Sequence, residues 1–172
     1  ALAFARSNKL DQTTFDSPKA RFGIIATGKS YLDTLQALYD LGIDKTKAAE
    51  IGIRLYKVGM PWPLEKEGVS KFAKDLEVIL IIEEKRPVME SQIKEFLFHW
   101  NENYRPKIIG KKDENGKPLF SSAGELNPTI ITYIIAERIK NFYKSEAIDN
   151  RLSFLRQKDK TLNDLIKLHR AL

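Results

Sequence analysis

The sequence has 172 residues, enough for one compact domain and a tail, since single domains usually contain about 100–150 residues. Hydrophobic residues make up 42% of the chain and charged residues 30%, which is typical of a globular protein in water. No apolar run reaches the roughly 20 residues of a membrane-spanning helix, and no secretory signal opens the chain, so we expect a cytoplasmic protein without membrane contact. The chain has no cysteine, which excludes disulfides, thiolate metal sites and iron–sulfur ligation within it.

The basic character of the chain has to be judged from where its charges lie. The net charge is +6 and the pI about 9.4. Residues 101–172 carry 14 basic and 9 acidic side chains, which is most of the excess. No aromatic residues alternate with these basic ones in the way that would stack bases, which argues against a nucleic-acid partner. A basic module that binds nucleic acid or protein stays an alternative if residues 105–117 and 151–170 share one surface.

The first predicted element is a buried strand at residues 22–26, which form a short apolar run. Ser30 then offers an N-cap, with Asp33 three residues later in a variant of the capping box. Gly42 is expected to end the helix. Its core face is predicted from four leucines at helical spacing, namely Leu32, Leu35, Leu38 and Leu41.

The same strand-then-helix unit recurs along the middle of the chain. Residues 51–58 predict a second strand, and an apolar helical face follows at residues 64–76. Residues 78–82 are five consecutive apolar residues, as expected for a strand covered on both faces. A helix through residues 93–100 and a short strand at 107–109 come next.

Alternating strands and helices predict a three-layer α/β/α fold with a mostly parallel sheet. A further core helix is expected at residues 129–143. Residues 147–170 predict a polar amphipathic tail, whose apolar stripe is Leu152, Leu155, Leu162, Leu165 and Ile166. We divide the chain into an N-terminal extension (1–20), an α/β domain (21–145) and a C-terminal helix leading toward a next domain (146–172).

Residues 23–30 match the spacing of a P-loop, glycine followed by any four residues and Gly-Lys-Ser. A P-loop is a cradle of backbone N–H groups that begins where a strand ends. Here Ile24 and Ile25 are better placed inside the strand, which leaves a simple strand-to-helix turn. A P-loop-like nucleotide hydrolase that uses residues 23–30 is kept as an alternative.

The carboxyl ends of parallel strands meet at one edge of a sheet, where ligands and partners gather. Adjacent carboxylates such as Glu83 and Glu84 point to opposite faces, so they do not form an acid–base dyad. Neither histidine has metal-ligand spacing, and no serine lies in a nucleophile elbow. We predict a domain or subunit interface and no catalytic, cofactor-binding or metal-binding residue in the chain. The candidate interface residues are Thr27, Gly28, Lys29, Ser30, Trp62, Glu83, Glu84, Lys85 and Arg86.

Several stretches of the sequence resemble the long, single-chain indolepyruvate ferredoxin oxidoreductases. The resemblance rests first on residues 21–33 (RFGIIATGKSYLD), 52–65 (GIRLYKVGMPWPLE) and 83–90 (EEKRPVME). It extends to Arg105-Pro-Lys-Ile-Ile-Gly-Lys, Gly124-Glu-Leu-Asn-Pro and Arg151-Leu-Ser-Phe, and so covers nearly the whole chain. The Ala-Thr-Gly turn and a strand ending near Met-Pro are also similar to the C-terminal domain of transketolases.

The resemblance implies a transketolase C-terminal-like, mixed sheet of five strands with one antiparallel edge strand. The sequence pattern shows four clear strands, so we expect a sheet of four to five strands, with the fifth in residues 1–20 or outside the sequence. It implies a thiamine-diphosphate-dependent enzyme that converts arylpyruvates to acyl-coenzyme A. Thiamine diphosphate, magnesium and iron–sulfur clusters would be held elsewhere in the full-length enzyme. Its partners would be the other domains, a second subunit, ferredoxin and coenzyme A. This segment would support domain packing and assembly, and Glu83→Lys is expected to impair assembly unless Glu83 is buried.

Overall fold

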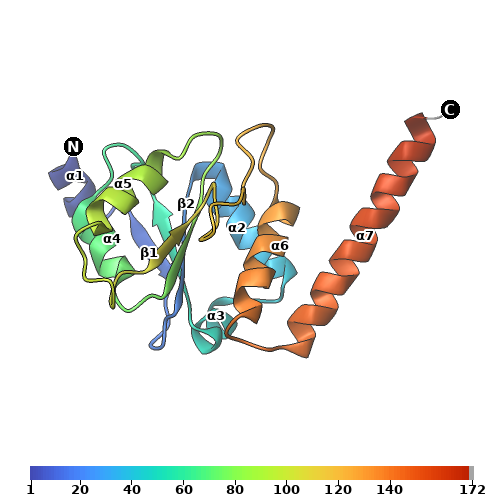
Figure 1. The fold of residues 1–172 in the computed structure, drawn as a ribbon, viewed down its shortest axis with the longest axis horizontal. Helices are drawn as coiled ribbons and strands as arrows, with labels where there is room; N and C mark the ends of the chain where they lie inside the picture. Colours follow the sequence, from blue (N-terminus) through green and yellow to red (C-terminus); the bar gives the residue numbers. More distant parts are fainter. Residues whose placement is uncertain (171–172) are drawn as a thin grey trace.

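The computed structural model describes the backbone of residues 1–170 and the side chains of residues 1–162, which form a five-stranded sheet between two layers of helices (Figure 1). The strands are β1 (Gln12–Phe15), β2 (Phe22–Thr27), β3 (Ile53–Val58), β4 (Val78–Ile82) and β5 (Lys107–Ile109). The helices are α1 (Leu2–Ser7), α2 (Gly28–Asp40), α3 (Lys45–Ile51), α4 (Lys66–Ala73), α5 (Val88–Leu97), α6 (Pro128–Lys140) and α7 (Glu146–Arg170). The expected three-layer, mostly parallel α/β fold is confirmed.

The strand order in the sheet is β1-β3-β2-β4-β5. The last four strands are parallel, whereas β1 pairs with β3 in the antiparallel direction and has an irregular register between Thr13 and Phe15. The fifth strand therefore lies within the first 20 residues. β1 has only four residues, and its burial is confined to Phe15, which is why its sequence carries no clear strand period.

Two hydrophobic cores lie on opposite faces of the sheet because neighbouring strand residues point to opposite sides. Ile24 and Leu80 belong to the core under α2, α3 and α6. Ile25 and Ile81 belong to the core under α4 and α5. All four side chains are almost fully buried. This double coverage explains why β2 and β4 read as continuous apolar runs.

Two local predictions in the first half of the chain are wrong. The strand predicted for residues 51–58 begins only at Ile53. Residue 51 instead ends α3, a seven-residue helix that was not predicted from the sequence. Asp44 caps this helix by accepting a hydrogen bond from the Lys47 N–H at 2.7 Å. Gly52 follows with a left-handed backbone as its C-cap. Asp44 and Gly52 are ordinary helix boundary residues, but the two buried side chains between them were too few to show a helical period.

The second error concerns the start of α2. The helix begins at Gly28 with Thr27 as N-cap, so Ser30 lies inside the first turn rather than before it. This shift also changes the buried face. Leu38 and Leu41 are buried as expected, whereas the Leu32 side chain is 63% exposed.

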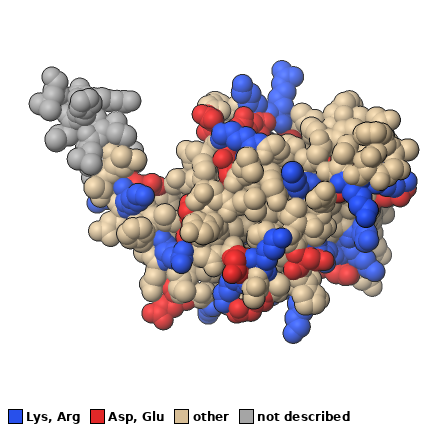
Figure 2. All heavy atoms as spheres, turned by 180° about the vertical axis from the view of Figure 1, so that it is seen from behind, with Lys and Arg blue, Asp and Glu red and all other residues tan. Residues whose placement is uncertain are grey.

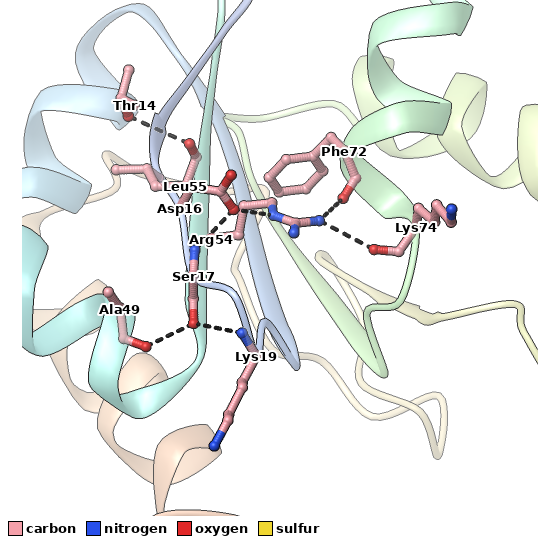
Figure 3. Close-up of polar contacts among 9 residues, drawn as sticks. All are labelled: Thr14, Asp16, Ser17, Lys19, Ala49, Arg54, Leu55, Phe72 and Lys74. Carbon is pink, nitrogen blue, oxygen red and sulfur yellow. Dashed lines mark hydrogen bonds and ion pairs between the residues drawn. The ribbon is translucent and has the colours of Figure 1, made fainter.

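An arginine clamp fastens the amino edge of the sheet, the edge where β2, β3, β4 and β5 begin (Figure 3). Arg54 donates to the Asp16 carboxylate at 2.7 Å and to the carbonyls of Phe72 and Lys74 at 2.9 and 3.1 Å. The last two carbonyls lie at the end of α4, so one side chain joins the segment after β1 to β3 and α4. Ser17, which is buried, donates to the Ala49 carbonyl at 2.7 Å and ties the same segment to α3.

The helix α7 leaves the domain body and projects from it (Figure 1). Of the predicted apolar stripe, Leu152 is buried, Leu155 is half-buried and the Leu162 side chain is 54% exposed. Leu165 and Ile166 lie outside the residues whose side chains are described. None of the helices within residues 1–170 combines the length and the apolar character needed to cross a bilayer.

Candidate interface at the carboxyl edge of the sheet

The carboxyl edge, where β2, β3, β4 and β5 end, brings the predicted segments to one end of the sheet. At the end of β2, the Thr27 hydroxyl donates to the Val58 carbonyl at 2.8 Å and joins the ends of β2 and β3. Gly28 has a left-handed backbone (φ +52°), and nothing lies within 4 Å of where a Cβ would stand. The turn is therefore open to the outside, and glycine suits it because of its backbone conformation.

The two residues after this glycine make contacts within the domain. Lys29 Nζ donates to Asp33 Oδ2 at 2.7 Å and to the Leu126 carbonyl at 3.2 Å, and the hydrogen bond to Asp33 raises the pKa of Lys29. Ser30 is buried. Lys29 is half-exposed and joins α2 to the loop before α6, so only its outer surface remains for a partner.

Trp62 is a large apolar side chain at this edge, and 69% of its surface is accessible. Its segment is held on both sides. Asp11 Oδ1 accepts hydrogen bonds from the Gly59 and Met60 N–H groups at 2.8 and 3.3 Å. The buried Gln92 donates to the Pro61 carbonyl at 2.9 Å and accepts from the Leu64 N–H at 2.8 Å. Trp62 therefore projects from a backbone that is fixed before and after it.

Glu83 is buried and has a structural task. Its two carboxylate oxygens accept hydrogen bonds from the N–H groups of Met89 and Glu90 at 2.8 and 3.0 Å, which are unpaired donors in the first turn of α5. Burial raises the pKa of Glu83, against the lowering effect of these bonds. Replacing it with lysine would put an unpaired cation in this position, so Glu83→Lys is expected to destabilise the domain itself.

The next three residues are more open. Glu84 is partly exposed, whereas Lys85 and Arg86 are exposed. Lys85 has a left-handed backbone (φ +48°), which is uncommon for a residue with a side chain. Within residues 1–162, none of the three side chains forms an ion pair or a hydrogen bond in the domain. Lys85 and Arg86 therefore present two cations, unpaired within these residues, at the same edge of the sheet as Trp62.

A second buried carboxylate at this edge lies on α5 and was missed by the sequence reading. Glu90 accepts a hydrogen bond from the Lys111 N–H at 2.8 Å, and its other oxygen pairs with Lys94 Nζ at 2.5 Å. Lys111 Nζ donates to the Glu83 carbonyl at 2.7 Å, and burial lowers the pKa of this lysine. These contacts lock the end of β5 to α5 and to the end of β4.

Three residues that were not predicted from the sequence fix the backbone of the edge loops through their side chains, namely Asp11, Glu90 and Gln92. Gln92 and Glu90 sit in a helix at positions that a helical period assigns to the core face beside Met89 and Ile93. A polar residue on an apolar helical face is a usable signal, because buried polar groups need partners. Asp11 precedes a strand that had no visible period, so no comparable signal was present.

The P-loop spacing at residues 23–30 does not form a phosphate cradle. Gly23 lies inside β2, paired with Arg54 on one side and Ile79 on the other. A Cβ at Gly23 would come within 2.5 Å of a Leu76 side-chain atom, so this glycine makes room for packing. Among the described residues, no three histidine, aspartate or glutamate side chains come together as metal ligands.

The basic residues are not gathered in one patch on the face that Figure 2 shows, where lysine and arginine side chains alternate with acidic ones. In the 105–117 segment, Arg105 donates to the Phe98 carbonyl at 2.8 Å and Lys111 is drawn inward. On this face the arrangement is that of a solvated, mixed-charge surface.

The domain is an α/β fold with a mostly parallel five-stranded sheet, and this fold is similar to that of a solved transketolase chain. A solved chain described as "Split gene transketolase, inactive beta4 tetramer" matches with a TM-score of 0.50 and 15% sequence identity, over 77% of this chain and 42% of that one. The family model for the "Indolepyruvate oxidoreductase domain" matches residues 12–162. The chain therefore belongs to the indolepyruvate oxidoreductase domain family, and the resemblance seen in the sequence is confirmed.

Two curated relatives are similar to part of the chain. The indolepyruvate oxidoreductase subunit IorA of Pyrococcus horikoshii is 42% identical over 92 residues, which is 54% of this chain and 13% of the relative. The subunit of the same name in Pyrococcus abyssi is 40% identical over 79 residues, 46% of this chain and 11% of the relative. The match thus spans only a small share of each relative's own length.

Proposed function

We propose that this domain supports the packing and assembly of a thiamine-diphosphate-dependent 2-oxoacid:ferredoxin oxidoreductase that acts on arylpyruvates such as indolepyruvate, and takes no direct part in catalysis. The observation that carries this proposal is that the buried and the exposed polar side chains at the carboxyl edge have different roles. Its buried carboxylates, Glu83 and Glu90, are bonded to backbone N–H groups. Trp62, Lys85 and Arg86 are exposed. An edge of this kind suits contact with another protein surface better than proton transfer.

A second exposed surface supports an assembly role. Large apolar side chains stand exposed on the outer faces of α2 and α7, where shallow hollows share Tyr39 and Phe154 among their lining residues. The exposed side chains are Leu32, Tyr39, Phe154 and Leu162, all more than half accessible. Several large apolar side chains exposed around neighbouring hollows are typical of sites that another protein covers.

In this proposal, thiamine diphosphate, magnesium and the iron–sulfur clusters bind other parts of the full-length enzyme, with ferredoxin and coenzyme A as its partners in the cytoplasm. The domain meets neighbouring domains of its own chain and a second subunit. Isothermal titration of the 172-residue chain with magnesium–thiamine diphosphate and, separately, magnesium–ATP is expected to show no binding. Micromolar binding of the first would make this a cofactor domain, and micromolar binding of the second would favour a nucleotide hydrolase.

The assembly role is tested in the full-length enzyme with the double variant Lys85→Glu/Arg86→Glu and, separately, Trp62→Ser. Because these side chains have no partner within the described part of the domain, the 172-residue chain should keep its unfolding temperature in each variant. In the full-length enzyme, sedimentation velocity should show a larger dissociated fraction, with a parallel fall in indolepyruvate-dependent dye reduction.

The matched control is Lys112→Glu/Lys117→Glu, which reverses two exposed lysines within residues 112–117. It changes the net charge by the same amount and should leave assembly as in the wild type. If the Lys85→Glu/Arg86→Glu and Trp62→Ser variants both assemble and turn over like the wild type and the control, the carboxyl edge is not the interface and the proposal is wrong.

A further inference from the structure

A hollow of about 210 Å³ lies at the amino edge of the sheet, opposite the candidate interface. It is formed where β2, β4 and β5 begin and where α6 ends. The carboxyl-edge residues discussed above take no part in it, and no task assigned to the domain so far uses it. Its walls are formed by both apolar and charged side chains.

The floor of this hollow is apolar and partly aromatic. Phe22 and Ile109 are almost fully buried beneath it. The rings of Phe22 and Phe142 lie with centroids 6.1 Å apart at an angle of 53°. Such a floor favours a flat apolar group, because aromatic rings pack well against one another in tilted or offset arrangements.

Three cations and two carboxylates surround this floor, which leaves an excess of one positive charge. Arg21 is paired with Glu77 through Nε and Nη2 at 2.6 and 3.0 Å. Arg138 is paired with Glu114 through Nη1 alone, at 2.7 Å to each oxygen. Lys107 has no ion pair among the residues with described side chains.

The guanidinium of Arg138 has unused donors that remain reachable. Its side chain is only 17% exposed, and its Nε and Nη2 make no hydrogen bond within residues 1–162. In that part of the chain, the one fully buried side-chain nitrogen or oxygen without a partner is Asp11 Oδ2. The free nitrogens of Arg138 are therefore accessible to solvent, and the hollow is the open space that this side chain borders.

We propose that this hollow binds a small organic carboxylate with a flat apolar body. The anion is paired with Lys107 and the free donors of Arg138. The apolar body lies against the partly exposed Phe142, whose ring packs on the buried Phe22 and also has the Arg21 guanidinium 5.3 Å from its centroid. A monoanion matches the single excess positive charge. Since each water occupies roughly 30 Å³, the hollow of about 210 Å³ has the volume of about seven waters, which suits a small ligand with a single ring. The ligand pocket is separate from the proposed assembly role and does not depend on it.

The test is an NMR titration of the ¹⁵N-labelled 172-residue chain with phenylacetate, a probe of the required size and charge. Saturable shifts are expected at Phe22, Ile109 and Asn141, with a dissociation constant on the order of 0.1–1 mM. Two further probes separate the parts of the proposal. 2-Phenylethanol has the ring without the charge, and inorganic phosphate has charge without the ring; each should bind at least about fivefold more weakly.

Two exposed variants report on the anion. Lys107→Gln removes a cation and Asn141→Asp adds a negative charge, and each should weaken phenylacetate binding by about two- to fivefold. Lys117→Gln, an exposed lysine outside the hollow, should bind like the wild type. The proposal is overturned if phenylacetate gives no saturable shifts up to about 10 mM, if 2-phenylethanol or phosphate binds equally well, or if Lys107→Gln and Lys117→Gln behave alike.

Discussion

The two C-terminal helices, α6 and α7, are neighbours in the chain but are held in different ways. α6 has 13 residues and buries five of them, among them Ile131, Ile135 and Ile139. α7 has 25 residues and is about 37 Å long at 1.5 Å per residue. Up to residue 162, it buries only Ile148 and Leu152.

Beyond its first two turns, α7 is joined to α6 by polar contacts. Arg156 pairs with Glu137 at 2.8 Å, and the Tyr133 hydroxyl donates to Asp159. The Arg156–Glu137 pair is an exposed ion pair, which contributes only about 0–1 kcal/mol. This difference shows that α6 is part of the hydrophobic core, whereas α7 packs on the domain mainly through its first two turns. Beyond them, α7 leaves apolar side chains exposed.

The largest expected effect is on the α6 side of this comparison. Ile135 is fully buried, so Ile135→Ala removes apolar contacts and leaves a cavity. The free energy of unfolding should fall by about 2–5 kcal/mol, as urea denaturation would measure. A loss below about 1 kcal/mol would mean that α6 is not a core helix and that the contrast with α7 is false.

A smaller effect is expected at the arginine clamp at the amino edge of the sheet, where Arg54 contacts α4. Arg54→Met keeps the side-chain length but leaves the Phe72 and Lys74 carbonyls without their donor, at a cost of about 1–3 kcal/mol. Arg21→Met is the matched control, because Arg21 is about half-exposed and its pair with Glu77 should be worth less than about 1 kcal/mol. Equal losses in urea denaturation would show that Arg54 acts as an ordinary surface ion pair.

The pH dependence of folding should report on the buried carboxylate of Glu83 at the carboxyl edge. Burial raises the pKa of Glu83 above its ordinary value of 4.5, so the folded state holds its proton more tightly than the unfolded state. This contribution to stability is fully present below pH 4.5 and is lost as the pH rises through the pKa of the folded state. Urea denaturation across this range should show that loss in the wild type and a flatter profile in Glu83→Gln. An unchanged profile in Glu83→Gln, with Glu84→Gln as control, would contradict it.

The smallest expected effect is on α7 itself. The Phe154 side chain is 65% exposed, so Phe154→Ala should change the free energy of unfolding of the 172-residue chain by no more than about 0.5 kcal/mol. The same substitution in the full-length enzyme should increase dissociation in sedimentation velocity. A clear loss of stability in the isolated chain would place Phe154 in the domain core and remove the distinction between the two helices.

The sequence predicted the parts of the fold that rest on long apolar patterns. β2 and β4 could be recognised because both faces of each strand are covered, which makes every residue apolar. α3 and β1 could not, because each buries only one or two side chains and depends on the sheet for its place. At the candidate site, Trp62, Lys85 and Arg86 could be placed at a strand end. The burial of Ser30 and Glu83 depends on where α2 and α5 begin, which strand periodicity does not specify.

The way Gln92 holds the Pro61–Leu64 segment bears on how fast and how tightly a partner can dock there. Association normally costs conformational entropy because loops and side chains must be ordered at the moment of contact. Here the backbone on both sides of Trp62 is already ordered by one buried amide, so a partner would have to restrict little more than the indole's own rotation. A tryptophan presented in this way can contribute to binding most of the free energy that its apolar surface provides.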